Sequence, residues 1–263
     1  MKLLEADKLG SCPTNSAKLS DAKEWALRMK EKGISYKTIS NDKRSLKAAF
    51  YTAIQEDCIR KNSFDFQLNT VIEDDKEPKV PLTAKQEESL LSFMQSDSVY
   101  QKYRDEVIIL LGTGLRISEL CGLTETDLDF ENRIINVDHQ LLRSAETGYY
   151  IEKPKTQSGI RQIPMSEKVY KALGRVLENR KGTKQLTIDG YSNFLFLNRD
   201  GCPKTGVNYS NMFRGLVKKY NKCHEEALSK VMTHHTLRHP YVKHKTKNIR
   251  ITLNILIFFI LNI

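Results

Sequence analysis

The stretch Leu111-Gly-Thr-Gly-Leu-Arg-Ile-Ser-Glu-Leu120 sets the local fold at the centre of the chain. Its two glycines end a buried helix that the apolar run Val107–Leu111 predicts. A short helix is expected over 115–123, and it presents Arg116 in its first turn. Helix N-termini attract anions and a guanidinium binds two phosphate oxygens, so this turn is typical of a phosphate site. The alternative is an ordinary ion pair between Arg116 and Glu119 or another carboxylate.

A lysine-containing turn is predicted within Lys153-Pro-Lys-Thr-Gln-Ser-Gly-Ile-Arg-Gln-Ile-Pro164. Three strand-like runs predict a small antiparallel sheet around it: Arg133–Val137, Tyr149–Glu152 and Ile160–Pro164. The tip of such a turn can reach into a groove, where the ammonium of Lys155 can donate a proton to a leaving oxygen. The alternative is an exposed hairpin lysine without a catalytic role.

Histidine and arginine occur together in a third motif, Thr233-His-His-Thr-Leu-Arg-His239. His235 and Arg238 are three residues apart, so they share one face if the segment is helical. Histidine can transfer a proton near neutral pH, and arginine binds phosphate. A zinc site is the alternative, but the segment lacks the usual zinc spacings. Asp127 and Asp129 lack the other ligands of a calcium loop, so no metal is expected.

The N-terminal part of the chain predicts two amphipathic helices and a linker. The first helix is expected from a Ser20 cap to Gly33, and the second from about Thr38 to Ile54. The second helix carries a basic face, formed by Lys37, Lys43, Arg44 and Lys47. Such a face either follows a phosphate backbone or is simply solvated. The charged segment 73–81 contains two prolines, which favours an extended linker and a domain boundary.

The remaining segments predict further helices. Thr83-x-x-Gln86 is a capping box, and Ser166 is suited to cap a helix over the apolar positions that follow it. Further helical stretches are expected near 208–221 and 225–232. With the short strands, they predict a mainly α fold with a small antiparallel sheet (α+β).

Charge is distributed unevenly over the 263 residues. The formal net charge is +10, from 42 Lys and Arg against 32 Asp and Glu. Residues 151–250 hold 21 basic and 7 acidic residues, a net +14, whereas residues 81–150 hold 6 and 12. A basic half of this strength favours a polyanionic partner such as nucleic acid, with solvated lysines as the alternative.

The sequence also bears on the compartment. No run of about 18 apolar residues occurs, so no membrane partner is expected, and the N-terminus has no secretion signal. Five scattered cysteines, none in a CxxC pair, favour a reducing compartment, and we expect a cytoplasmic protein. Segment 251–263 has 10 apolar residues among its 13, no charge, and a composition prone to aggregation.

Taken in order, T-G-L-R-I-S-E-L, K-T-x-S-x-x-R-x-I-P and H-T-L-R-H resemble the motifs of the tyrosine recombinase, or phage integrase, family. The stretch Ser35–Leu68 looks like the helical core-binding domain of that family. Val137-Asp-His-Gln-Leu141 adds a resemblance to integrases of conjugative transposons. The resemblance covers about residues 9–255. It implies a helical core DNA-binding domain over 1–72, the linker 73–81, an incomplete catalytic domain over 82–250 and an aberrant apolar tail over 251–263.

The resemblance also implies roles for single residues. Arg116 and Arg238 match the two arginines that bind the scissile phosphate, and Lys155 matches the lysine that protonates the leaving 5′ oxygen. His235 matches the histidine beside that phosphate. The family needs no metal or nucleotide cofactor. Its partner is double-stranded DNA, and other copies of this chain or full-length recombinase protomers are expected as further partners.

The C-terminal segment departs from the family. Its nucleophile is a tyrosine, and in the register of Lys247–Asn254 that position falls on Leu256. Tyr241 is the only tyrosine after Arg238, at the wrong distance. The first hypothesis is a strand-exchange enzyme with a truncated or frameshifted C-terminus, which we expect to be inactive alone. The second is a non-catalytic DNA-binding remnant that competes at recombination sites. A helical protein-interaction module is a third, which the three motifs disfavour.

Overall fold

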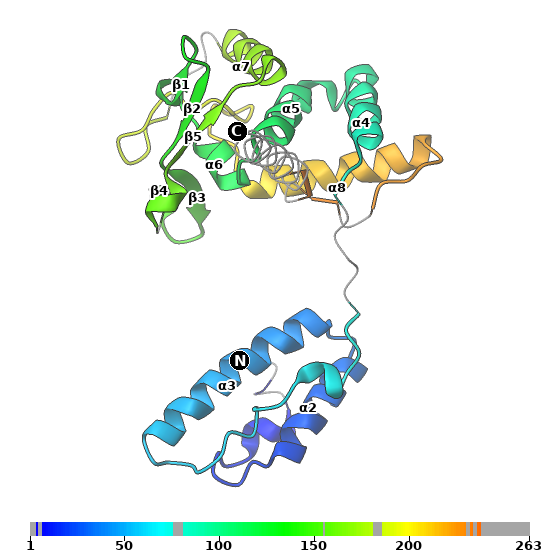
Figure 1. Ribbon diagram of the computed structural model, residues 1–263, viewed down its shortest axis with the longest axis vertical. Coiled ribbons are helices and arrows are strands. Elements are labelled where there is room, and N and C mark those ends of the chain that lie inside the picture. Colours follow the sequence, from blue (N-terminus) through cyan, green and yellow to red (C-terminus); the bar gives the residue numbers. More distant parts are fainter. Residues whose placement is uncertain are drawn as a thin grey trace, which may run out of the picture. The chain divides into compact units, whose positions relative to one another are not determined.

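The chain forms two compact units, Met1–Pro78 and Lys79–Ile263 (Figure 1). The computed structural model describes residue 4 and residues 7–75, 81–154, 156–180, 186–229, 232–233 and 236–237. The division between the units falls inside the segment 73–81, and each unit has its own hydrophobic core. Over the residues so described, no helix is both long enough and apolar enough to cross a membrane.

The first unit is built on two helices that lie side by side, α2 (Leu19–Glu31) and α3 (Tyr36–Gln55) (Figure 1). Two short 3-10 turns accompany them, η1 (Lys8–Ser11) and η2 (Leu68–Thr70). Helix α2 begins one residue before Ser20, so the predicted cap is wrong. Asp21 instead accepts a 2.9 Å hydrogen bond from the backbone N–H of Lys18.

The core of the first unit is aromatic. The Trp25 ring is fully buried and meets Phe64 edge to face, with ring centroids 5.8 Å apart. Ile39, on the first turns of α3, is also fully buried. Burial of such side chains stabilises a domain by about 1.5–3 kcal/mol each, so these contacts fix α3 against α2.

The described residues of the second unit form five helices: α4 (Ala84–Ser96), α5 (Arg104–Thr113), α6 (Ile117–Gly122), α7 (Glu167–Asn179) and α8 (Gly206–Cys223). Short 3-10 turns lie at η3 (Gln101–Tyr103), η4 (Glu125–Asp127) and η5 (Gln157–Gly159). Both predicted caps are confirmed. The Thr83 and Gln86 side chains form the capping box of α4, and Ser166 Oγ accepts from the backbone N–H of Val169. The predicted helix over 225–232 is wrong at least for 225–229, which are not helical.

The strands in the described part of the chain form two antiparallel sheets, and this corrects the single sheet expected from the sequence. One sheet has the order β1 (Leu128–Asp129), β2 (Ile134–Val137) and β5 (Arg161–Pro164), and the other pairs β3 (Gln140–Ser144) with β4 (Gly148–Glu152). Strands β1 and β3 were not predicted. Only Asp138 and His139 separate β2 from β3, and His139 is buried against α6, so the chain changes sheets at this point.

Helix α5 is part of the core of the second unit. Its burial fixes the position of the turn that follows, which leads into α6. Val107 and Ile109 are fully buried. Helix α7 packs closely on α5, since a Cβ atom at Gly112 would lie 2.4 Å from Val169 Cγ2. The mainly α fold with small antiparallel sheets is therefore confirmed, with α6 held at the junction between α5 and the strands (Figure 1).

Candidate active site and nucleic-acid interface

A tight turn between α5 and α6 places Arg116. Gly114 ends α5 with a left-handed φ of 62°, which side chains disfavour, and its N–H bonds to the carbonyl of Leu110. Arg116 is the N-cap of α6 and has an extended backbone. The sequence therefore positions this arginine through a helix end, a glycine and a new helix start.

Glu119 holds Arg116 in two ways. Its carboxylate accepts from the Arg116 backbone N–H at 2.7 Å and from Arg116 Nη1 at 2.7 Å. The side chain of Glu119 is only 5% exposed, whereas that of Arg116 is 52% exposed. The ion pair that was the alternative reading of Arg116 is therefore present. It orients the guanidinium and leaves half of its surface open to an anion.

A second arginine shares the same carboxylate. Arg161 donates from Nη1 and Nη2 to the two oxygens of Glu119, at 3.0 and 2.7 Å. Burial alone would raise the pKa of Glu119, but the hydrogen bonds from Arg161 and Arg116 and the charge of Arg161 outweigh it and hold the pKa at about 2. Two guanidiniums on one carboxylate leave a net charge of about +1, which suits an anion-binding site.

Three of the four predicted catalytic residues, Lys155, His235 and Arg238, lie outside the described residues. Tyr241 and Leu256, on which the prediction of a missing nucleophile depends, lie outside them as well. Their neighbours are described in part. The strands β4 and β5 flank the turn that carries Lys155, and Thr236 and Leu237 are buried.

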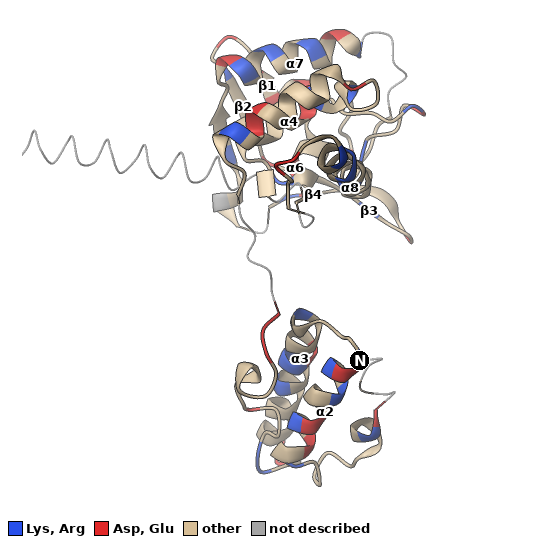
Figure 2. Ribbon diagram, turned by 90° about the vertical axis from the view of Figure 1, so that its right-hand side faces the viewer, with Lys and Arg blue, Asp and Glu red and all other residues tan. Residues whose placement is uncertain are grey.

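Basic residues lie along α3, as Figure 2 shows, and the four predicted cations differ in their exposure and partners. Lys37 and Arg44 are exposed and have no partner among the described residues. Lys43 Nζ lies 4.5 Å from the centre of the Phe66 ring, and partial burial, followed by the charge of Lys47, lowers its pKa. Two of these cations are thus available to a phosphate backbone, and the other two are already engaged.

Lys47 forms an ion pair with Asp65, a partner that the sequence does not predict. Its Nζ lies 2.6 Å from Asp65 Oδ1, and Tyr51 donates its hydroxyl to the same carboxylate at 2.9 Å. The hydrogen bond from Lys47 is the main reason why the pKa of Asp65 is lowered. Because 18 residues separate the two partners, local periodicity gives no signal for this pair.

One cluster in the described part of the chain has the composition of a metal site. Potential ligand atoms of Asp127, Asp138 and His139 all lie within 4.8 Å of one another. Each already has a protein partner. His139 Nδ1 lies 2.6 Å from Asp138 Oδ1, its Nε2 lies 2.8 Å from the carbonyl of Gly122, and Asp127 accepts from Thr124. An ion would have to displace these bonds, so hydrogen bonding explains the cluster better than metal binding does.

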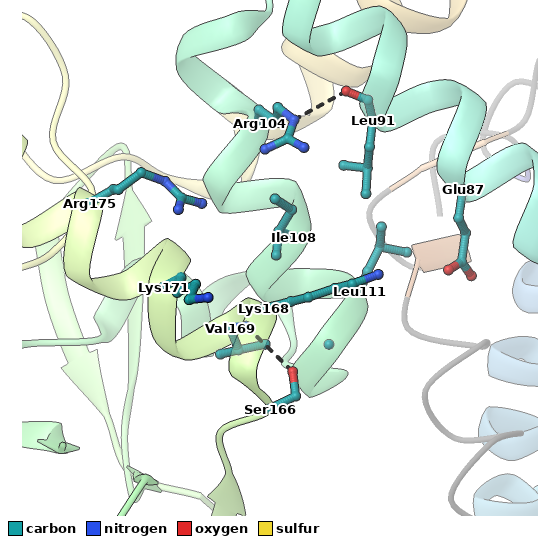
Figure 3. Close-up of a pocket in the computed structure, with 11 residues that line it drawn as sticks. Glu87, Leu91, Arg104, Ile108, Leu111, Ser166, Lys168, Val169, Lys171 and Arg175 are labelled. Carbon is teal, nitrogen blue, oxygen red and sulfur yellow. Dashed lines mark hydrogen bonds between the residues drawn. The ribbon is translucent and has the colours of Figure 1, made fainter. Parts of the chain in front are cut away.

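A pocket of about 370 Å³ lies between α4, α5 and α7 (Figure 3). Its apolar lining includes Leu91 and Ile108, and four basic side chains surround it: Arg104, Lys168, Lys171 and Arg175. Of these, Arg175 is bonded to Asp105 and Lys171 to Glu167. The pocket contains none of the described site residues, so the candidate active site is a surface built on α6 and not this pocket.

Comparison with known proteins shows to which protein family this chain is similar. The model of the phage integrase family matches residues 81–246. The chain is 60% identical over 241 residues to the transposase from transposon Tn916 of Enterococcus faecalis, a match that covers 92% of this chain and 59% of the relative. The chain is also 28% identical over 229 residues to the tyrosine recombinase XerC of Bacillus pumilus, covering 85% of this chain and 66% of that protein. It therefore spans about 59% of the length of the Tn916 relative.

Solved structures agree with this assignment. The integrase of transposon Tn1549 in complex with a circular intermediate DNA matches with a TM-score of 0.90 and 68% identity, over 94% of this chain and 78% of that one. Lambda integrase bound to DNA matches with a TM-score of 0.58 and 16% identity, over 91% of this chain and 75% of that one, which shows the fold alone. Since the family model covers more than half of the sequence and the motifs predicted the same family, this chain belongs to the phage integrase family.

Proposed function

We propose that this chain binds double-stranded DNA in the site-specific recombination of a mobile element. The observation that carries the proposal is the half-exposed Arg116 guanidinium, held by a nearly buried Glu119 within the part of the chain that matches the integrase family. In such an arrangement the carboxylate fixes the position of the guanidinium, while the exposed half of the guanidinium can bind a phosphate. The DNA-bound Tn1549 integrase, 68% identical, supports the same ligand.

The two units take different parts in this proposal. Residues 1–72 act as the helical core DNA-binding domain, 73–81 as the linker and 82–250 as the recombinase domain. In the first unit, Lys37 and Arg44 on α3 contact the phosphate backbone, because they are exposed and unpaired among the described residues. Lys43 and Lys47 contribute less, because Phe66 and Asp65 already engage them.

The phosphate chemistry that we propose uses four side chains. Arg116 and Arg238 bind the scissile phosphate and stabilise the extra negative charge of its transition state. Lys155 protonates the leaving 5′ oxygen, and His235 lies beside the phosphate. These groups activate the phosphate and protonate the leaving oxygen without a metal or nucleotide cofactor, but they supply no atom that attacks the phosphorus. Further copies of this chain, or longer recombinase protomers, supply the other subunits of the recombining complex.

Strand cleavage is a separate question from DNA binding. With Leu256 at the position of the family tyrosine, a phosphotyrosyl link has no nucleophile there. We therefore propose that a chain of this sequence does not cleave DNA alone. The second candidate function, a non-catalytic protein that occupies recombination sites, follows from the same substitution.

All five cysteines are free, which supports our placing the protein in the cytoplasm.

The experiment is a filter-binding titration of duplex DNA at several salt concentrations. Binding that weakens steeply with salt, with a slope of about −0.9 per phosphate contact, is expected. Arg116→Ala should lower this slope. Arg133→Ala is the matched control, because Arg133 is 49% exposed and also bonded to a carboxylate, that of Glu167. A chain that does not bind duplex DNA at low salt refutes the proposed function.

A further inference from the structure

The segment 153–160, here named the lysine turn, is flanked by Glu152 and Arg161, here named its first and second foot. Hydrogen bonds connect each foot to α6, in one case through Gln140. The turn leaves β4 at Glu152 and enters β5 at Arg161. It carries Lys155, which lies outside the described residues, whereas both feet are described. Ser118 of α6 reaches the first foot through Gln140 of β3, and Glu119 of α6 binds the second foot directly.

The first foot is joined to α6 through Gln140. Gln140 on β3 is the direct cross-strand partner of Glu152 on β4, and its Nε2 donates to Glu152 Oε2 at 2.8 Å. The other side of the same amide accepts from Ser118 Oγ, also at 2.8 Å. The amide of Gln140 thus connects the first turn of α6 with the end of β4. All three side chains are only partly exposed, which limits competition from water.

The second foot is joined to α6 through Arg161. Its guanidinium spans both carboxylate oxygens of Glu119 and also donates from Nη1 to the carbonyl of Gly159, inside the turn, at 3.2 Å. The same Glu119 holds Arg116. One carboxylate therefore fixes the position of Arg116 and of the strand that follows the lysine turn.

A third contact joins the C-terminal end of α6 to the segment between β2 and β3. His139 lies between β2 and β3, and its Nε2 donates to the carbonyl of Gly122, because a carbonyl can only accept. The backbones of α6 and β3 also meet closely, since a Cβ atom at Gly122 would lie 2.9 Å from the backbone nitrogen of Leu141. The backbones of α6 and β3 are thus in close contact at Gly122, where a larger residue would not fit.

We propose that Gln140 and Arg161 are positioning residues that hold the two described ends of the lysine turn on α6, in register with Arg116. This inference rests on the proposed function. Proton donation and phosphate binding both require placement to within about 1 Å, and a shift of that size lowers rates about 100-fold. Bonds from one helix to both feet of the turn supply such placement, whereas a turn bonded at one foot only could pivot.

The test is a double-mutant cycle on DNA affinity, and it does not depend on strand cleavage. Gln140→Glu places a carboxylate opposite Glu152, so the first foot is repelled from α6. The expected result is a salt slope lower by about 0.9, the value of one lost phosphate contact, as for Lys155→Ala. In the Lys155→Ala background, Gln140→Glu should have no further effect, because it acts through Lys155. A purely structural role would give additive losses.

An exchange of the two side chains provides the rescue. In the double variant Gln140→Glu/Glu152→Gln, the new carboxylate accepts from Ser118 and from the new amide, so the slope should return to the wild-type value. This double variant also has the net charge of the wild type. Gln162→Glu, on the exposed face of β5, is the charge control and should not lower the slope as Gln140→Glu does. If Gln140→Glu does not fold, Ser118→Ala replaces it and should act in the same direction.

The probe is a duplex with the right-end sequence of transposon Tn1549, the type of DNA found in one integrase complex. A wild-type slope in Gln140→Glu and in Ser118→Ala overturns this inference but leaves the proposed function intact. Additive losses with Lys155→Ala, or a double exchange that stays impaired although folded, also overturn it. If the wild-type chain does not bind the duplex at all, the proposed function fails and this inference fails with it.

Discussion

Replacement of Glu119 by glutamine should remove a large and pH-dependent part of the stability of the second unit. The carboxylate is nearly buried and accepts two hydrogen bonds from Arg116 and two from Arg161. Its pKa is about 2, compared with 4.5 for an ordinary glutamate. At about 1.36 kcal/mol per pKa unit, this corresponds to about 3 kcal/mol.

The sign of the effect follows from the direction of the pKa. Because the folded state lowers the pKa of Glu119, the stabilisation is present above pH 4.5 and is lost as the pH falls through about 2. The wild type should therefore exceed Glu119→Gln in free energy of unfolding by a margin that narrows by about 3 kcal/mol between these pH values. Glu146→Gln, in the exposed turn between β3 and β4, is the control and should keep the wild-type pH dependence.

The assay is urea denaturation at several pH values, followed by far-ultraviolet circular dichroism. The single tryptophan, Trp25, lies in the core of the first unit, so its fluorescence reports a part of the molecule that Glu119→Gln should not affect. The reasoning is refuted if the wild type and Glu119→Gln lose stability in parallel between pH 5 and pH 2. It is also refuted if Glu119→Gln shifts the urea midpoint of the tryptophan transition as much as that of the second unit.

Three further predictions concern DNA binding, the turn before α6 and strand cleavage. Arg44→Ala should weaken binding to all duplexes alike and lower the salt slope by about 0.9, whereas Lys47→Ala should have a smaller effect in the same titration, because Asp65 already pairs with Lys47. Equal effects of the two changes would contradict this. Gly114→Ala should lower the free energy of unfolding by about 1 kcal/mol or more, measured by urea denaturation, because its φ of 62° strains any side chain. An unchanged denaturation midpoint would show that the turn relaxes. A nicked duplex should form no covalent adduct on a denaturing gel, because Leu256 has no nucleophilic atom, and an adduct that disappears in Tyr241→Phe would identify a displaced nucleophile.

Much of the fold was predictable because its signals are local. The capping residues Thr83 and Ser166 bond to backbone groups within three residues, so sequence spacing is enough to identify them. The glycine break before α6 is equally local. Strand β3 was missed because its contacts come from β4 and α6, and the Ser20 cap was wrong because the side chain of Asp21 caps α2 from inside the helix.

The sequence by itself determined the family, the mainly α fold and the identity of Arg116 as a candidate phosphate ligand, because ordered motifs and helix signals depend on neighbours along the chain. Only the tertiary structure decided which cations are available. Lys47 is engaged by Asp65, and Arg116 shares Glu119 with Arg161, which is 42 residues away from that glutamate. Such pairs join segments that are distant in sequence, and the pKa values and exposures that they set depend on burial and distance, which a one-dimensional pattern does not contain.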